Sequence, residues 1–478
     1  MLDKFLDDYV DKMYLNSNVN MSLEQRNLYK KEDYYALLKP VVLLLKKYPD
    51  YSLEELRNKL FEESGLREKV KKFIYEDKMT PGAVITYGTN NYRETLVIGN
   101  REEVVFKNGK IISSVKEMTN DTIFDLASIT KLFTSVSILL LVSKGMINLD
   151  DKIVKYASNF KNLSDVSIYD LLSFKVPLKT SKRLDDVSFM EAKDILNNIE
   201  VSSLEPFKNP YTDMGAIVLK SVIESASGMP FYDFLDKEIL SPLLMQDTNY
   251  QTKYKLDRVA STILGGVITN DGFIRDTTGI KGLPHDKKAR VLLPDGMPGH
   301  AGLFSTAQDM SLFAKGLINK QVLPMNYLDS LAVNRTGKKV IVGGFEKYVQ
   351  YLGYLCYLKH PNLKDSELFH AMSGKSFASA GFTGGELTID PLNEIYFFLG
   401  TNRVHNRIIR NTTGKDIKEL EVDGSIIPNA SKFAWQRDEY LVHPCLKLAI
   451  QYKMLEDFYK LCKEKIPTGS ITKKIWSV

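Results

Sequence analysis

The first 76 residues carry a helical pattern of apolar and charged positions. Leucines recur among Lys and Glu at intervals of three and four residues, which is the spacing of one face of an amphipathic helix. Ser52 stands three residues before Glu55, and this spacing predicts a capping box at the start of one helix. We therefore expect a helical N-terminal extension over residues 1–76 that packs against the rest of the protein or offers a surface to a partner.

A strand-like pattern follows this extension. Residues 83–88 and 95–99 are rich in Val, Ile and Thr and are separated by polar residues, which predicts two β-strands joined by a turn. The strand signal continues over residues 104–106. Asn108 followed by Gly109 then favours another tight turn. The sequence thus predicts hairpins at the start of the core.

Helical periodicity returns at Ser128. The apolar residues after it repeat at three- and four-residue intervals until Gly145, as is typical of a helix that a glycine ends. Residues 150–370 are predicted to be mainly helical with loops. This long stretch separates the first strands from those that follow.

Two strand-like runs come next, over residues 382–389 and 395–400, and Asp-Pro-Leu-Asn at 390–393 supplies the turn between them. Strands bury their apolar face only against other elements, so the C-terminal hairpin must join the N-terminal one in a single sheet. We predict an α+β fold with a core over residues 77–405. Residues 406–478 are predicted to be a loop followed by a helical C-terminal extension.

Composition and charge narrow the class of protein. The chain has 478 residues, of which 44% are hydrophobic and 26% charged, as in ordinary globular proteins. The net charge is +5 with no basic stripe, which argues against nucleic acid as a partner. Acidic residues interrupt the N-terminus, and no apolar run is long enough to span a bilayer. We expect a cytoplasmic protein without a signal peptide or membrane span, and leave its oligomeric state open.

Metal and cofactor motifs are missing from the sequence. The three cysteines are widely spaced, which disfavours a disulfide framework or a zinc site. The six histidines are scattered and form no H-E-x-x-H motif. Neither a phosphate-binding P-loop nor the G-x-S-x-G turn of α/β-hydrolases is found. We therefore expect no metal and no organic cofactor.

Four Ser-x-x-Lys motifs occur, and they begin at Ser113, Ser128, Ser158 and Ser470. On a helix, positions i and i+3 share a face, so the motif brings an amine close to a hydroxyl. Serine becomes a good nucleophile only when a base takes its proton, and desolvation lowers the pKa of a lysine toward that role. Only Ser128 opens a long apolar helix, whose free N–H groups favour negative charge. Ser128 and Lys131 are therefore the candidate pair.

The surroundings of Ser128 resemble a known family. Residues 125–153, DLASITKLFTSVSILLLVSKGMINLDDKI, are similar to the nucleophile helix and following loop of class C-type β-lactamases, DD-peptidases and related esterases. The likeness continues over about residues 80–405, in segments 209–216, 239–245, 299–306, 381–385, 389–391 and 401–405. The resemblance implies a β-lactamase/transpeptidase-like fold, in which an antiparallel sheet is flanked by helices and joined to a mostly helical subdomain, with the site between them.

The resemblance also implies roles for individual residues. Ser128 attacks a carbonyl and becomes acylated, while Lys131 polarises the hydroxyl. Tyr211, in a segment similar to the family's Tyr-x-Asn motif, carries the proton to the leaving group and then takes one from water. The backbone N–H groups of Ser128 and Phe382 form the oxyanion hole, which contributes roughly 3 kcal/mol per donor to the transition state.

Two residues depart from the family pattern. Asp213 replaces the asparagine of Tyr-x-Asn; it accepts but does not donate hydrogen bonds, and an ion pair with Lys131 would raise the pKa of that lysine and weaken it as a base. Ser379 stands where the family usually has Lys or His two residues before Gly381. Because Ser379 brings no charge, the sequence argues against strong β-lactamase activity.

Several hypotheses follow. The first is a serine hydrolase that acts on an ester or amide, such as a D-amino-acid peptide, a cell-wall fragment or a small ester. Its contacts to the small-molecule or peptide substrate would include Asp213, Ser379, Gly381 and His300, and His285 is a further candidate. The alternative is a catalytically weak or inactive binding protein on the same fold, which Asp213 and Ser379 favour. A third hypothesis gives the terminal helices a scaffold role.

Overall fold

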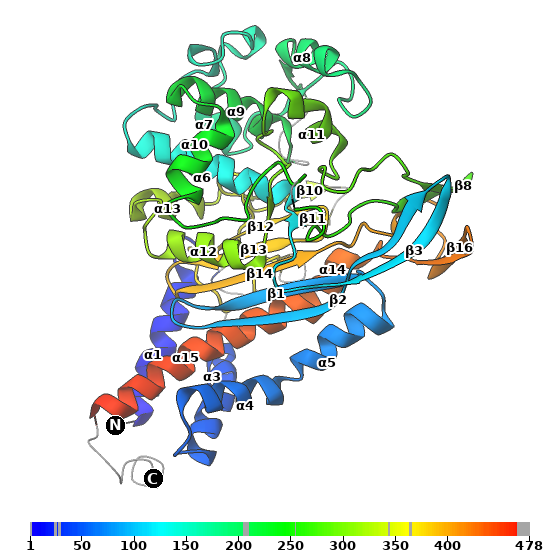
Figure 1. Cartoon of the computed structure of the whole chain (residues 1–478). Helices are drawn as coiled ribbons and strands as arrows, with labels where there is room; N and C mark the ends of the chain where they lie inside the picture. Colours follow the sequence, from blue (N-terminus) through cyan, green and yellow to red (C-terminus); the bar gives the residue numbers. More distant parts are fainter. Residues whose placement is uncertain are drawn as a thin grey trace.

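A six-stranded antiparallel sheet forms the centre of the molecule (Figure 1). The computed structural model describes residues 2–22, 26, 30–203, 210–253, 255–342, 345–362 and 366–465. In spatial order the strands are β12 (Phe377–Ala380), β13 (Glu386–Asp390), β14 (Ile395–Thr401), β1 (Gly82–Thr89), β2 (Arg93–Lys107) and β3 (Lys110–Glu117). β1 pairs with β14, and Ala83 lies opposite Thr401. The predicted union of N-terminal and C-terminal hairpins is confirmed.

Turn residues explain the hairpins at both ends of this sheet. Asn108 and Gly109 join β2 to β3 with φ angles of 52° and 75°, the left-handed conformations that favour an Asn-Gly pair. Asp390 ends β13, and its carboxylate accepts the N–H of Asn393 at 3.1 Å, so the turn predicted at 390–393 is confirmed.

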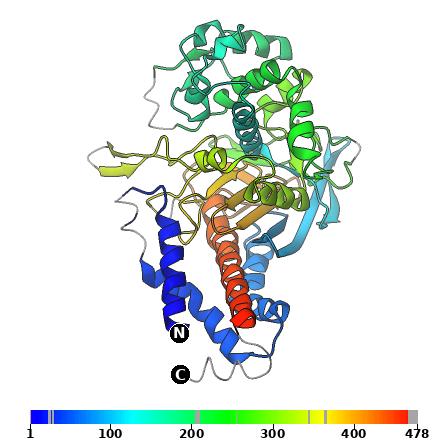
Figure 2. The ribbon, with the colours of Figure 1, turned by 90° about the vertical axis from the view of Figure 1, so that its left-hand side faces the viewer.

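The two ends of the chain cover one face of the sheet (Figures 1 and 2). α15 (His443–Lys465) lies along β1 and β14 and also contacts α3 (Lys31–Lys47) and α4 (Leu53–Ser64). The predicted capping box of α4 is present, because Ser52 accepts the N–H of Glu55 and donates its own N–H to the Glu55 carboxylate at 2.7 Å. The elements of this layer are α1 (Leu2–Asn18), α3 (Lys31–Lys47), α4 (Leu53–Ser64), α5 (Leu66–Lys71), the π-helices η1 (Lys72–Glu76) and η8 (Asp438–Val442), α14 (Phe433–Arg437) and α15 (His443–Lys465).

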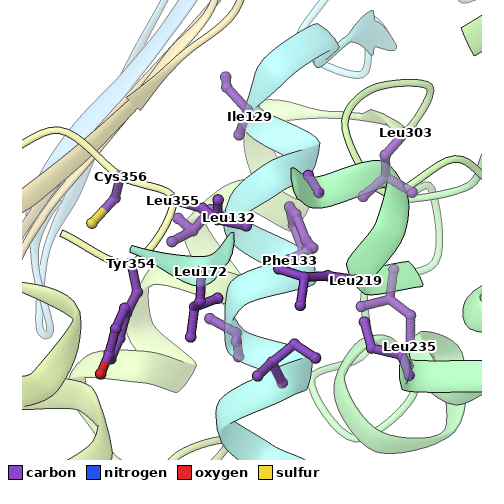
Figure 3. Close-up of a cluster of buried hydrophobic side chains, with 14 of the residues drawn as sticks. Ile129, Leu132, Phe133, Leu172, Leu219, Leu235, Leu303, Tyr354, Leu355 and Cys356 are labelled. Atoms are coloured by element: carbon purple, nitrogen blue, oxygen red, sulfur yellow. The ribbon is translucent and has the colours of Figure 1, made fainter. Parts of the chain in front are cut away.

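A helical subdomain lies on the opposite face, and Figure 3 shows part of its core. α6 (Thr130–Ser143) runs through the middle, with every residue from Thr130 to Leu141 buried, because its sequence is apolar on nearly all sides. Phe133 stacks on Phe313 with ring centroids 4.2 Å apart. The surrounding helices are α7 (Ile168–Leu172), α8 (Phe189–Asn197), α9 (Met214–Ser227), α10 (Phe231–Leu235), α11 (Lys287–Leu292), α12 (Ala307–Ile318) and α13 (Met325–Leu331), with short η2 (Ala127–Ile129), η3 (Ile153–Lys155), η4 (Lys161–Leu163), η5 (Asp236–Leu240) and η6 (Leu293–Asp295).

Several short strands were not predicted. The stretch 150–370 contains β5 (Leu178–Lys179), β6 (Glu200–Val201), β7 (Gly266–Thr269), β8 (Gly272–Arg275), β9 (Phe304–Ser305), β10 (Lys339–Val342) and β11 (Phe345–Tyr348), and β9 pairs with β4 (Phe124–Asp125). The predicted loop after residue 406 holds β15 (Ile408–Asn411), β16 (Glu419–Val422) and β17 (Ser425–Pro428). Strands of two to four residues are too short for an alternating pattern to stand out.

The strand predicted over 382–389 begins later than expected. Residues 382–384 form a turn, in which the Gly384 N–H donates to the Gly381 carbonyl at 2.9 Å. Gly384 has a φ of 100°, which favours glycine. The regular strand starts only at Glu386, and β12 precedes the turn.

Two further features concern the length of the apolar helices and the cysteine side chains. Among the described residues, no helix is both long and apolar enough to cross a bilayer. Cys356 and Cys445 are buried free thiols, and burial raises the pKa of Cys356 to about 12. Both are therefore poor nucleophiles at neutral pH.

Candidate functional site

Ser128 sits on a strained turn between β4 and α6. Ala127 has a φ of 46°, a left-handed conformation that costs roughly 1–2 kcal/mol for a residue with a Cβ. Neighbours hold this turn in place: the Thr383 hydroxyl donates to the Asp125 carbonyl at 2.7 Å, and the Leu126 N–H donates to the Leu303 carbonyl at 2.9 Å. Ser128 is left partly exposed at the start of the helix.

Lys131 lies one turn further along the same helix, and its side chain is fully buried, with 0% exposed. Its Nζ is 2.7 Å from Ser128 Oγ, 2.7 Å from Asp213 Oδ1 and 3.3 Å from the His300 carbonyl oxygen. An ammonium group has three N–H donors. Each donor of Lys131 therefore has an acceptor, and one of them points at the serine hydroxyl.

The charge state of Lys131 follows from these contacts. Burial lowers its pKa, but the charges of Tyr211 and Asp213 outweigh burial and raise the pKa above its usual range. Asp213 shows the matching shift: burial raises its pKa, but the neighbouring charges, that of Lys131 first among them, together hold it well below its usual range. The structure therefore favours an ammonium at Lys131 that polarises Ser128, over a neutral amine that takes its proton.

Tyr211 reaches the site from the segment before α9. Its ring stacks on Phe174 and Tyr357, with centroids 5.4 Å and 5.5 Å apart. Lys131 Nζ lies 4.9 Å from the centre of the Tyr211 ring. The hydroxyl, the ammonium and the phenol that the sequence singles out thus meet at one place. Of the other Ser-x-x-Lys motifs, Ser113 lies in β3, Ser158 in a turn, and Ser470 outside the described residues.

A chain of alternating charges extends from Asp213. Its second carboxylate oxygen lies 3.2 Å from Lys288 Nζ, and Lys288 in turn lies 3.0 Å from Asp286. Asp286 begins α11, where it accepts the N–H of Ala289 at 2.8 Å. Its other contact is His300 Nε2 at 3.2 Å. The sequence analysis did not single out Lys288, because no motif in the neighbouring residues indicates a role for it.

His300 faces the protein interior. Its side chain has 0% exposed surface, and its contacts join Asp286 on one side and, through the carbonyl, Lys131 on the other. This placement sets His300 behind Lys131 and away from solvent, in contrast to the substrate contact expected from the sequence.

The end of β12 packs directly against the nucleophile's turn. A Cβ on Gly381 would lie 2.6 Å from the Leu126 carbonyl oxygen, so only glycine fits there. Ser379 is nearly buried, with 3% exposed, whereas Phe382 is 53% exposed. The short distance between these backbones places the turn that carries the Phe382 N–H beside Ser128.

Arg403 supplies a positive charge at this turn. Its Nε donates to the Phe382 carbonyl at 2.7 Å, and its guanidinium lies 4.7 Å from the centre of the Phe382 ring. His285 stacks on the same ring, with centroids 5.6 Å apart. Ser379 brings no cation to the strand, and Arg403 is a cation that the structure places close by. Its segment was noticed in the sequence, but no role was given to the arginine.

Asp125 links the nucleophile's turn to the loop before α11. Its carboxylate accepts two backbone N–H groups, from Ala127 at 2.9 Å and from His285 at 2.7 Å. Burial raises the pKa of Asp125 to about 6, although both hydrogen bonds oppose the shift. Sequence reasoning missed this role because the partners of a buried carboxylate depend on distant segments.

We expect activity to fall as the pH drops through about 6. Asp125, with its pKa of about 6, then takes up a proton and loses an acceptor for one of its N–H donors. An Asp125→Asn variant has only one acceptor oxygen, so it should have low activity without this acid limb and lose about 1–3 kcal/mol of stability. Ester hydrolysis across the pH range checks this, with Asp151→Asn as control. A flat wild-type profile through pH 6 would contradict the role.

Two aspartates and a histidine lie close together at this site, as the ligands of a metal ion do. Ligand atoms of Asp213, Asp286 and His300 lie within 4.8 Å of one another. Lys131, however, already contacts Asp213, and Lys288 contacts both aspartates. A divalent ion would have to displace these two cations, so the arrangement does not fit a metal site.

A cavity of about 340 Å³ opens beside Tyr211 and Asp213. Polar and charged side chains form much of its wall, and the lining residues are Thr180, Arg183, Leu184, Asp185, Tyr211, Thr212, Asp213, Met214 and Lys288. Such a hollow gives part of a substrate room next to the candidate trio.

Comparisons with known proteins agree on the family. A family model described as Beta-lactamase matches residues 74–416. The N-acetylmuramyl-L-alanine amidase of Bacillus subtilis (strain 168) is 27% identical over 334 residues, which cover 64% of this chain and 73% of the amidase.

Solved structures of low sequence identity show the same fold. EstCE1, a hydrolase with promiscuous acyltransferase activity, covers 80% of this chain and 100% of its own, with a TM-score of 0.55 and 15% identity. The D-amino acid amidase from Ochrobactrum anthropi SV3, complexed with D-phenylalanine, covers 82% of this chain and 99% of its own, with a TM-score of 0.53 and 18% identity. The predicted fold class is confirmed.

Proposed function

Because the chain belongs to the beta-lactamase family, we propose that it is a serine hydrolase that forms an acyl-enzyme on Ser128. One observation carries this proposal: Lys131 Nζ lies 2.7 Å from Ser128 Oγ, while Asp213 and the His300 carbonyl take its other two donors. A saturated ammonium lowers the cost of negative charge on the serine oxygen. The same contact argues against an inactive binding protein.

The proposed first step is attack by Ser128. Tyr211, reacting as a phenolate, accepts the proton of the hydroxyl, and Oγ forms a bond to the substrate carbonyl carbon. The carbonyl oxygen takes the negative charge in front of the N–H groups of Ser128 and Phe382. The bond to the leaving group then breaks, and the leaving group receives the proton from Tyr211. Water then attacks the acyl-enzyme and gives a proton to Tyr211. The bond to Oγ breaks, Ser128 recovers its proton from Tyr211, and the acid is released.

The proposed substrate is an ester or amide, such as a D-amino-acid peptide, a cell-wall fragment or a small ester. The names of two similar proteins, an N-acetylmuramyl-L-alanine amidase and a D-amino acid amidase, support an amide. The nearly buried Ser379 brings no cation to the strand. A substrate carboxylate at this strand would then lack the Lys or His that usually pairs with it in the family, and the nearby Arg403 donates its Nε to the Phe382 carbonyl. This argues against β-lactams.

A panel of substrates tests this proposal. We expect the purified full-length chain to hydrolyse short nitrophenyl esters and amides of D-amino acids. Hydrolysis of penicillin or nitrocefin should be about ten- to a hundredfold slower, since one missing charged contact costs about 1.5–3 kcal/mol. An absence of turnover across the esters and amides would refute the hydrolase. Fast β-lactam hydrolysis would refute the substrate assignment alone.

A further inference from the structure

We propose that Lys288 is a positioning residue, which neutralises Asp213 and so lets an aspartate occupy the place of the family's asparagine. This inference rests on the proposed function, because it concerns the same reaction. An asparagine next to Lys131 would be neutral, whereas an ionised aspartate adds a full negative charge beside the site. The structure places a second lysine where it can cancel that charge.

The contacts of Asp213 are divided between the two lysines. Oδ1 lies 2.7 Å from Lys131 Nζ, and Oδ2 lies 3.2 Å from Lys288 Nζ. Asp213 and Lys288 are only partly exposed, with 25% and 21% of their side-chain surfaces accessible. Solvent therefore screens this pair less than a surface ion pair. Lys288 therefore offsets part of the negative charge of Asp213 behind the ammonium of Lys131, although it also lies 3.0 Å from Asp286.

The other carboxylates near Lys288 have partners of their own. Asp286 lies 3.2 Å from His300 Nε2 and accepts the N–H of Ala289. Asp185 lies 3.9 Å from Lys288 but only 2.8 Å from the Nε of Arg183. Removing Lys288 would thus take the ammonium away from the second oxygen of Asp213, with the His300 imidazole within 4.8 Å of this carboxylate. Asp185 and Asp286 keep their other contacts.

This charge matters most during attack on the carbonyl. Negative charge then develops on the substrate oxygen, and an uncompensated Asp213 would repel it. It would also draw Lys131 more strongly, at the expense of its contact with Ser128. The two effects have the same sign, so loss of Lys288 should slow acylation. Replacing Asp213 with asparagine removes the source of both effects.

A double-mutant experiment tests the proposal. Acylation by nitrophenyl acetate is measured for Lys288→Met, Asp213→Asn and the double variant, with Lys287→Met as the control. Lys287 is the neighbouring lysine of α11, 41% exposed, with its Nζ 3.7 Å from Asp276. We expect Lys288→Met to slow acylation about tenfold, a size common for groups in contact. The double variant should be about tenfold faster than Lys288→Met, and Lys287→Met should match the wild type.

Two results would overturn the role of Lys288. One is a double variant no faster than Lys288→Met. The other is an equal loss in Lys287→Met, which would point to a general effect of surface charge. Thermal unfolding of each variant separates loss of fold from loss of chemistry; if Lys288→Met does not fold, Lys288→Gln makes the same comparison. Failure of the wild type to acylate Ser128 would instead refute the proposed function.

Discussion

Replacing Ser128 with alanine should lower kcat/KM for a nitrophenyl ester by about 10⁴-fold or more, as loss of a nucleophile does in serine hydrolases. The variant should fold normally, because Ser128 is partly exposed and its hydroxyl accepts one bond from Lys131. Losing that bond costs only about 1 kcal/mol. Steady-state kinetics and thermal unfolding of the purified proteins measure both effects.

The chain offers a matched control in its other Ser-x-x-Lys motifs. Ser113 in β3 is exposed and is followed by Lys116 at the same spacing. Ser113→Ala should keep wild-type activity, because the strand geometry does not place its hydroxyl in a site. Residual hydrolysis by Ser128→Ala within about tenfold of the wild type would show that another group is the nucleophile.

Replacing Tyr211 with phenylalanine should reduce kcat by about 10²–10⁴-fold, the range for loss of a general acid–base group. The phenyl ring keeps its stacking on Phe174 and Tyr357, so stability should change little. The contacts of Lys131 assign the proton transfer to Tyr211, since an ammonium with three acceptors has no free electron pair. The kinetics of ester hydrolysis measure the loss.

Tyr156→Phe is the control for this variant. The Tyr156 hydroxyl contacts Asp151 at 2.7 Å, outside the candidate site, so this variant loses a phenol hydroxyl without affecting the chemistry. If Tyr211→Phe retained activity within about threefold, the proton would have to pass to Lys131 or to water. The assignment of the proton transfer to Tyr211 would then be wrong.

Local patterns were sufficient to predict the framework of the fold. The apolar residues after Ser128 produce a helix buried on nearly all sides, and Asn108 with Gly109 defines a tight turn. The relation between Ser128 and Lys131 is also local, because both lie within one helical turn. Such features depend on near neighbours, which a sequence pattern records directly.

The features that the sequence did not predict depend on contacts between distant segments. No pattern in the neighbouring residues indicates a role for Lys288 or Asp125. Their roles follow only from the packing of α11 and the turn at Ala127. The turn at 382–384 looked like a strand because Phe382 and Thr383 have high strand propensity. Its bend follows from Gly384, with its φ of 100°, and from the close approach of Gly381 to Leu126. Propensity gives way to tertiary contacts at such places.

The most direct test is the mass of the intact protein after brief incubation with an activated ester, followed by mapping of the modified peptide. The account predicts an added acyl group on the peptide that contains Ser128, and no such addition in Ser128→Ala. An acyl group on a different residue, or equal labelling of Ser128→Ala, would contradict it.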